Sequence, residues 1–177
     1  MRNHFVEPES KDAIVLGAIK SGAKKFDKIQ KVTRIEAEEL HAILERLEKR
    51  GLIGVEEKKG IFGKKVEIEV TKKGKNELEH RIHELEENWN HMQMLYKAGD
   101  KQKLQEELEN NKGILPMMMF FGIIDIMMFS MMFSMIGAAM HDYVPAEDIP
   151  QGMDDSGGEQ GDAEGMDDGG FDIDIGF

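Results

Sequence analysis

The sequence contains no cysteine, one tryptophan, two tyrosines and four prolines among its 177 residues. Without cysteine the chain can form neither disulfides nor thiolate metal sites, and an intracellular location fits this composition. The opening segment, MRNHFVEPESKD, lacks the apolar stretch of a secretory signal. The chain also offers no nucleophile–base pair, no phosphate-binding glycine loop and no carboxylate pair expected to be buried. We therefore expect a cytoplasmic protein that is not an enzyme and carries no cofactor.

Positive charge is scarce in the second half of the chain. Residues 1–76 carry 18 Lys and Arg against 13 Asp and Glu, whereas residues 77–177 carry 5 against 22. No Lys or Arg follows Lys112. A basic head can approach polyanions, while a strongly acidic tail repels them and keeps the chain soluble.

Helical spacing of apolar residues, followed by a change to alternation, organises residues 10–79. The pattern predicts helices over 10–20, around Ile29 and Val32 with Asp27 as the N-cap, and over 37–50, with Gly51 just past the end. Two strands should follow, over 52–55 and 66–70. Thr71 is expected to cap the next helix.

This order of elements resembles the winged helix-turn-helix family of MarR- and PadR-type archaeal and bacterial regulators. The residues that carry the resemblance are LHAILERLEKRGLI (Leu40–Ile53), KKGIFGKK (Lys58–Lys65) and VTKKGKNELE (Val70–Glu79). It covers about 10–85 and implies a mostly α fold with a small β-hairpin wing, in which 37–50 is the recognition helix and Lys58–Lys65 the wing.

Basic side chains in this head would form a rim suited to phosphates. The predicted DNA contacts are Lys24, Lys25, Lys28, Lys31, Arg34, Arg46, Lys49, Lys58, Lys59, Lys64 and Lys65. Against this stand Glu36, Glu38 and Glu39, which crowd the end of the recognition helix and are unfavourable beside phosphates. Both interpretations therefore remain: a winged helix that binds duplex DNA, and one that contacts other proteins.

A long helix is expected over 72–98, with an apolar seam at heptad-like spacing. The seam consists of Leu78, Ile82, Leu85, Trp89, Met92 and Tyr96. We expect it to pair with a second subunit in a homodimer, since winged-helix proteins usually read two half-sites. The alternative is that it folds back onto the chain's own helix over 101–111, after a turn at Gly99-Asp100.

The opposite face of this long helix carries His80, His83, Glu87 and His91 in one line. Imidazole and carboxylate at such spacing can hold a divalent metal. The line is expected to face solvent without groups that would orient the rings, so we predict no metal site.

Residues 114–140 form a run of apolar residues that contains nine of the fourteen methionines and one charge, Asp125. Three interpretations compete: a membrane-embedded helix, a flexible surface for a hydrophobic partner or client, and a core shared between subunits. Pro116, Gly122 and Gly137 would permit two short helices. The predicted membrane or partner contacts are Met117, Met118, Phe120, Phe121, Met127, Met128, Phe129, Met131, Met132, Phe133 and Met135.

The tail over 142–177 is acidic and rich in glycine, so we expect it to be disordered. Its last residues, Phe171–Phe177 (FDIDIGF), regain an alternating apolar pattern and could dock as a short motif or add a strand to a partner's sheet edge. The alternative is that the acidic tail keeps the chain soluble, shields the apolar segment or competes with DNA for the basic head. We divide the chain into a winged-helix domain (1–76), a long helix and helical turn (77–112), a Met-rich segment (113–141) and this tail. The expected function is a dimeric, winged-helix transcriptional regulator with membrane or partner contact through 114–140. The alternative is a winged-helix adaptor, or a chaperone-like protein, that binds hydrophobic segments of clients without binding DNA.

Overall fold

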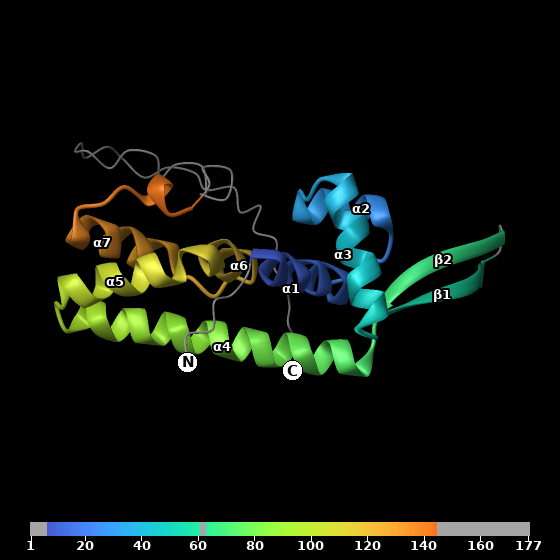
Figure 1. Ribbon diagram of the computed structural model, residues 1–177, viewed down its shortest axis with the longest axis horizontal. Helices are drawn as coiled ribbons and strands as arrows, with labels where there is room; N and C mark the ends of the chain where they lie inside the picture. The colour runs from blue at the N-terminus through green and yellow to red at the C-terminus, as the bar shows by residue number, and fades with distance from the viewer. Residues whose placement is uncertain (1–6, 61–62, 145–177) are drawn as a thin grey trace, which may run out of the picture.

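The computed structural model describes residues 7–60 and 63–144 and is mostly helical, with one two-stranded antiparallel hairpin (Figure 1). The helices are α1 (Glu7–Lys20), α2 (Phe26–Thr33), α3 (Ala37–Lys49), α4 (Lys72–Lys97), α5 (Lys101–Asn111), α6 (Leu115–Phe120) and α7 (Ile126–Ile136). Short 3-10 turns occur at η1 (Lys112–Ile114) and η2 (Met140–Asp142), and the strands are β1 (Ile53–Gly60) and β2 (Gly63–Val70). The expected disorder of the tail and docking of Phe171–Phe177 lie outside the described residues.

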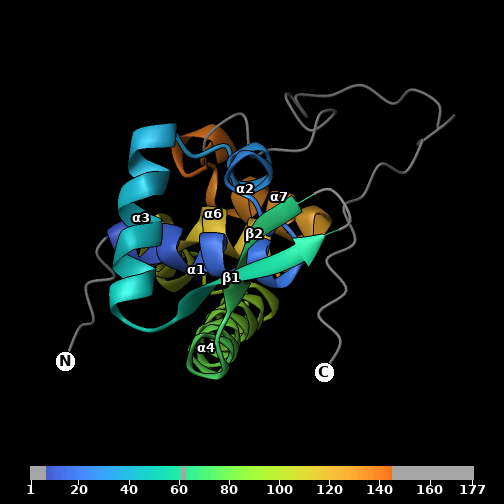
Figure 2. The same ribbon diagram turned by 90° about the vertical axis from the view of Figure 1, so that its right-hand side faces the viewer.

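The molecule is elongated, and α4 runs along most of its length (Figure 1). The hairpin projects from one end, beside α2 and α3, while α5 and α7 lie at the other end. Viewed from the hairpin end, α4 lies beneath α1 and α6 (Figure 2). The two ends are therefore joined by one long helix below and by α1 and α6 above it.

The hairpin is anchored at its base. Its register pairs Ile53 with Val70 and continues to Gly60 opposite Gly63. The Ile68 amide donates to the Lys24 carbonyl over 2.9 Å, which joins β2 to the loop between α1 and α2. Gly74, in the first turn of α4, lies so close to the start of β1 that an added Cβ would be 2.1 Å from the Leu52 carbonyl oxygen.

Helix ends follow the predicted capping in most places. Thr71 accepts a hydrogen bond from the Gly74 amide over 3.1 Å, and Gly51 has the positive φ of 70° expected just past α3. The prediction of Asp27 as an N-cap is wrong, because α2 already begins at Phe26 after an extended Lys25. Asp27 lies in the first helical turn, where its charge still complements the helix dipole.

The apolar seam of α4 is buried by the chain itself. Five of its six residues, all except the half-buried Tyr96, are at most 5% exposed. Leu104 and Leu108 of α5 are fully buried in the same core. The Trp89 ring packs edge-on against Phe129 of α7, with 6.1 Å between the ring centroids. The expectation that this seam meets a second subunit is therefore corrected: α4 folds back on α5, as in the alternative, and Tyr96 is the seam residue that keeps part of its surface exposed.

The Met-rich segment is broken into α6 and α7. Gly122 has a φ of 65°, and the side chain of Asp125 caps α7 by accepting from the Met128 amide over 2.9 Å. Gly137, with a φ of 73°, ends α7 after 11 residues. Asp125 is thus at a helix end, not in the middle of one apolar helix. Within residues 7–60 and 63–144, no helix combines the length and the apolar composition needed to cross a bilayer.

A single hydrophobic core connects the two ends of the molecule. Buried residues from Ala13 in α1 to Val144 after η2 belong to one cluster. At its centre Gly17 of α1 faces the ring of Phe121, which follows α6, and an added Cβ would lie 2.5 Å from a ring carbon. The absence of a side chain at position 17 therefore lets α1 approach the Met-rich segment closely.

Candidate nucleic-acid interface and methionine-rich surface

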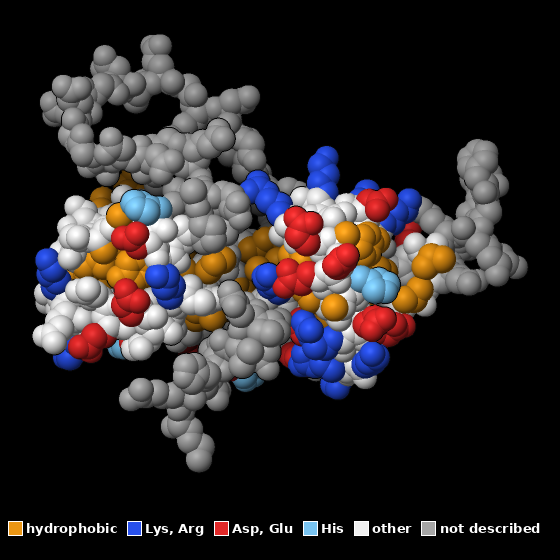
Figure 3. All heavy atoms as spheres, turned by 45° about the horizontal axis from the view of Figure 1, so that its top comes forward, with side chains coloured by type: hydrophobic (Ala, Val, Ile, Leu, Met, Phe, Trp, Pro, Cys, Tyr) orange, Lys and Arg blue, Asp and Glu red, His pale blue; other side chains and the backbone are white. Residues whose placement is uncertain are grey.

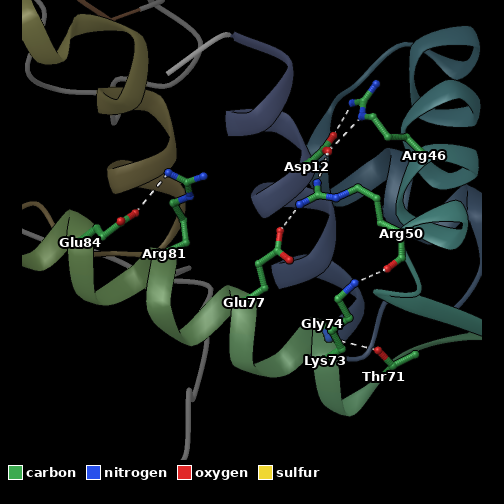
Figure 4. Close-up of polar contacts among 9 residues, drawn as sticks. All are labelled: Asp12, Arg46, Arg50, Thr71, Lys73, Gly74, Glu77, Arg81 and Glu84. Atoms are coloured by element: carbon green, nitrogen blue, oxygen red, sulfur yellow. Dashed lines mark hydrogen bonds and ion pairs between the residues drawn. The ribbon is translucent and has the colours of Figure 1, made fainter. Parts of the chain in front are cut away.

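Arg46, predicted as a DNA contact, is held within the protein by Asp12 of α1. Its Nε donates to one Asp12 oxygen over 3.0 Å and its Nη2 to the other, and this hydrogen bonding raises the pKa of the guanidinium (Figure 4). Arg50 donates to the same carboxylate over 3.3 Å and also to Glu77 of α4. Since Asp12 is only 4% exposed, this network fixes α3 to α1 and removes Arg46 from a freely extended rim.

The basic side chains of α2 are placed differently. Lys25, Lys28, Lys31 and Arg34 are exposed along α2 and at its two ends. Lys24, by contrast, is half-buried and bonded to Glu69 of β2 over 2.7 Å. Arg34 ends α2 in the left-handed conformation, with a φ of 55°. Exposed basic side chains thus lie along α2, whereas Lys24 connects the α1–α2 loop to the hairpin.

The outward face of α3 is acidic. Glu38, Glu45 and Glu48 are exposed there, together with His41 and Lys49. Lys49, another predicted DNA contact, lies 3.4 Å from Glu45. The space-filling view shows acidic and basic side chains intermixed over the α2–α3 end (Figure 3). Carboxylates on this face would repel phosphates if α3 entered a groove of DNA.

The hairpin gathers the remaining predicted lysines. Its register places Lys58 opposite Lys65 and Lys59 opposite Lys64. Residues that are directly opposite in an antiparallel pair have Cβ atoms about 4.5–5.5 Å apart, and like charges there are destabilising. Four lysines therefore occupy two adjacent rungs of the hairpin, which projects from one end of the molecule.

Most of the predicted membrane or partner contacts are core residues. Met117, Met118, Phe121, Phe129, Met132 and Phe133 are buried, and Phe120, Met128 and Met135 are half-buried. Only Met127 and Met131 are well exposed, at 66% and 47%. They lie four residues apart on α7, where hydrophobic side chains are visible on the surface (Figure 3). Of the eleven predicted contact residues, the well-exposed ones thus lie on one face of α7.

A groove of about 680 Å³ separates the α2–α3 turn from α6, with α1 between them. Its apolar lining is formed by Ile14, Val32, Ile35, Pro116, Met117, Met119 and Phe120. Lys11 and Glu39, joined over 2.7 Å, lie at its edge together with Arg34 and Glu36. Sequence reasoning missed this groove, because its walls come from distant parts of the chain and no local pattern links them.

Tyr143 fastens the end of the Met-rich segment to α5. Its hydrogen bond with Glu109, aided by burial and by the charges of Glu109 and Asp142, raises the pKa of Tyr143 to about 12. The Tyr143 ring packs edge-on against Phe133, with 4.9 Å between the ring centroids. The Lys112 ammonium lies 5.1 Å from the centroid of the Tyr143 ring. The last described residues therefore lie beside η1, next to the groove-lining Gly113.

No protein-family model, curated protein or solved structure matches this chain. The function must accordingly be inferred from the chain's own surfaces. Of these, the basic residues of α2 and the hairpin, the acidic face of α3, the exposed methionines of α7 and the groove are the candidates.

The histidine line of α4 pairs with carboxylates. His80 lies 3.5 Å from Glu84, His83 lies 3.5 Å from Glu87, and His91 lies 3.4 Å from Glu107 of α5. Among the residues that the structure describes, no group of three or more His, Asp or Glu side chains is arranged to hold a metal ion. The geometry thus offers pairwise contacts between imidazole rings and carboxylates on a solvated face.

Proposed function

We propose that this protein is a winged-helix DNA-binding regulator whose hairpin and α2 contact duplex DNA, while α3 stays clear of it. The observation that carries the proposal is the pairing of Lys58 with Lys65 and Lys59 with Lys64 across the hairpin. Like charges at directly opposite positions of a hairpin are destabilising, whereas bound phosphates would offset such repulsion.

The position of α2 supports a DNA-contacting face that includes both α2 and the hairpin. The hydrogen bond between Ile68 and Lys24 links β2 to the start of α2, so both groups of lysines belong to one structural unit. Exposed Lys25, Lys28 and Lys31 extend the positive charge along this unit. Contacts of this kind go to phosphates and carry little sequence information. We therefore expect binding with weak sequence preference.

The acidic face of α3 limits how the protein can sit on DNA. Glu38, Glu45 and Glu48 are exposed on it, and Arg46 is bound to Asp12. A recognition helix normally presents arginine, lysine or amide side chains to base edges. The proposed complex accordingly keeps α3 away from the groove floor. Assembly as a homodimer on two half-sites remains part of the proposal, through a surface other than the seam of α4.

The test is the salt dependence of duplex DNA binding by the full chain. Replacing Lys64 and Lys65 by Gln should lower the affinity and reduce the slope of log K against log salt by about 0.9 for each phosphate that is no longer neutralised. The matched control replaces Lys97 and Lys101 by Gln, which removes the same charge at exposed positions around the far end of α4. Equal effects of the two pairs, or no binding at low salt, would overturn the proposal.

A second candidate function is the binding of hydrophobic protein segments or membrane surfaces by α7. It is favoured by the exposure of Met127 and Met131, since methionine repacks readily around varied apolar partners. Replacing both by Gln should weaken the binding of an apolar helical peptide, measured by fluorescence anisotropy, and lower flotation with lipid vesicles. Binding that is unchanged in this variant would rule out α7 as the contact surface.

A further inference from the structure

The groove between the α2–α3 turn and α6 has an apolar floor and a charged edge. The half-buried Ile14, Met119 and Phe120 contribute to the floor, while Lys11, Arg34, Glu36 and Glu39 lie around it. Its volume of about 680 Å³ is enough for a few apolar side chains, since pockets of roughly 300–1,000 Å³ accept ligands of drug size. The occupant that fits should therefore be apolar on one side and polar on the other.

The chain carries such a peptide in its own tail. In Phe171–Phe177, apolar residues occupy every second position: Phe171, Ile173, Ile175 and Phe177 alternate with Asp172, Asp174 and Gly176. In an extended peptide these two sets face opposite sides. One face would enter the groove, and the aspartates would point outward toward the charged edge.

The tail begins close to the groove and is long enough to reach it. Tyr143 packs against Lys112, whose neighbour Gly113 lines the groove. Residues 145–170 separate the last described residues from Phe171, and a flexible chain of 26 residues spans about 28 Å on average. Tethering of this kind raises the effective concentration of a weak peptide to the millimolar range.

Charge favours the same placement. The linker over 145–170 holds nine acidic residues and no Lys or Arg. With its end in the groove it would pass near the exposed Lys28, Lys31 and Arg34 of the α2 region. Attraction between these charges is long-ranged and would weaken with salt.

We propose that Phe171–Phe177 binds in the groove between the α2–α3 turn and α6 of the same chain, and that the acidic linker then covers the lysines of α2. The docking itself does not depend on the proposed function. Its consequence does: a docked tail competes with DNA for the basic face, so DNA binding is held back until the tail is displaced.

The absence of cysteine from the chain permits a direct test by disulfide trapping. A full-length variant with Met119→Cys and Ile175→Cys should form an intramolecular disulfide at least tenfold faster than a variant with Met131→Cys and Ile175→Cys. Met131 is a stringent control, because it is a methionine that is more exposed than the half-buried Met119, and it lies nearer the start of the tail in the chain. Equal rates, or a faster reaction at position 131, would overturn the docking site.

A second variant separates docking from random collision of a tethered tail. Replacing Phe171, Ile173 and Phe177 by Ser in the Met119→Cys, Ile175→Cys chain should lower the trapping rate to that of the control. Circular dichroism of each variant verifies that the helical content is retained. A rate that does not change with these substitutions would contradict the proposal.

DNA binding then distinguishes the two proposals from each other. Without engineered cysteines, the Phe171, Ile173 and Phe177→Ser variant should bind duplex DNA several-fold more tightly than the original chain. Trapping at position 119 in a protein that binds no DNA would refute the proposed function and leave the docking intact. Trapping together with unchanged DNA affinity would refute the competition.

Discussion

At the scale of single residues, Asp12 shows how one buried carboxylate sets the position of a helix. It is 4% exposed and accepts hydrogen bonds from both Arg46 and Arg50. A buried charge is expensive to desolvate unless it is paired, so Asp12 is stable there only with α3 close by. The same pairing takes Arg46 away from any external ligand.

Tyr143 gives a prediction for alkaline pH. Its pKa is raised to about 12, mainly by the hydrogen bond with Glu109, whereas a tyrosine in the unfolded chain titrates near pH 10. Below about pH 10 both states keep the proton, and the stabilisation is complete. As the pH rises from about 10 toward 12, the unfolded chain loses the proton first, so the free energy of unfolding falls.

Urea unfolding across this pH range measures the effect. The Tyr143→Phe variant should be less stable than the original chain at neutral pH, and its disadvantage should shrink as the pH approaches 12. In a Tyr96→Phe chain Tyr143 is the only tyrosine, so the tyrosinate absorbance reports its titration directly. A midpoint near pH 10 in that chain would contradict the prediction.

Residue roles could be predicted from the sequence only where they are local. Thr71 as an N-cap and Gly51 as the residue past α3 depend on neighbours within a few positions, and both were confirmed. The partners of Asp12 are 34 and 38 residues away, and Glu109 is 34 residues from Tyr143. Such pairs arise from tertiary packing, which no short-range pattern encodes.

At the scale of elements, Asp125 decides where α7 begins. Its carboxylate caps the helix at the Met128 amide, so Asp125→Ala should lower the free energy of unfolding by about 1 kcal/mol. This loss should affect the stability of the whole protein and not of α7 alone, because Phe129 and Met132 of α7 are buried in the shared core. Chemical denaturation measures it.

The control for this prediction is Asp125→Asn. Asparagine is as good an N-cap as aspartate, so this variant should keep most of the stability while removing the charge. If the Ala and Asn variants were equally destabilised, the charge and not the cap would be responsible.

Element types could be predicted because their apolar periods are clear. Alternation at Val66, Ile68 and Val70 indicated a strand, and the stripe of α3 indicated a helix. The N-cap of α2 was misplaced, because Lys25 is extended and the helix begins at Phe26. The preceding Lys24 is hydrogen bonded to β2, 44 residues away, and no local pattern indicates that contact. Residues 114–140 allowed both one helix and two, and the combination of Gly122 and Asp125 produced two.

At the scale of the whole molecule, the contact between Gly17 and Phe121 joins the two ends. In an isolated helix, Gly→Ala would stabilise by about 1 kcal/mol. Here the added methyl group would meet the Phe121 ring at 2.5 Å, so Gly17→Ala should instead destabilise by about 1–3 kcal/mol. Thermal or urea unfolding determines the sign.

A double-mutant cycle tests whether the ring is the cause. In a chain that already carries Phe121→Leu, the Gly17→Ala substitution should cost markedly less, because the smaller side chain leaves room for the methyl group. Additive effects of the two changes would show that Gly17 is constrained by something other than Phe121.

The prediction that the seam of α4 forms a dimer interface was wrong, because periodicity cannot show which part of the whole molecule covers a helix. A heptad-like stripe says that a helix is covered on one side, but it does not say by which chain. The chain supplied its own cover through α5 and α7, since Leu104, Leu108 and Phe129 share the core with the seam of α4. The groove and the exposed face of α7 likewise depend on this arrangement and could not be predicted from periodicity.

Because α4 is long and contacts both ends of the protein, a small change in its orientation at one end would produce a larger displacement at the other. With 26 residues it is about 39 Å long. The base of the hairpin packs against Gly74 in the first turn of α4, while α5 and α7 pack against the far end of α4. A tilt of about 5° at that end would swing the hairpin by about 3 Å, close to the spacing of successive residues in a strand. A ligand on the α7 face that tilted α4 by this amount would therefore move the lysine-bearing hairpin without touching it.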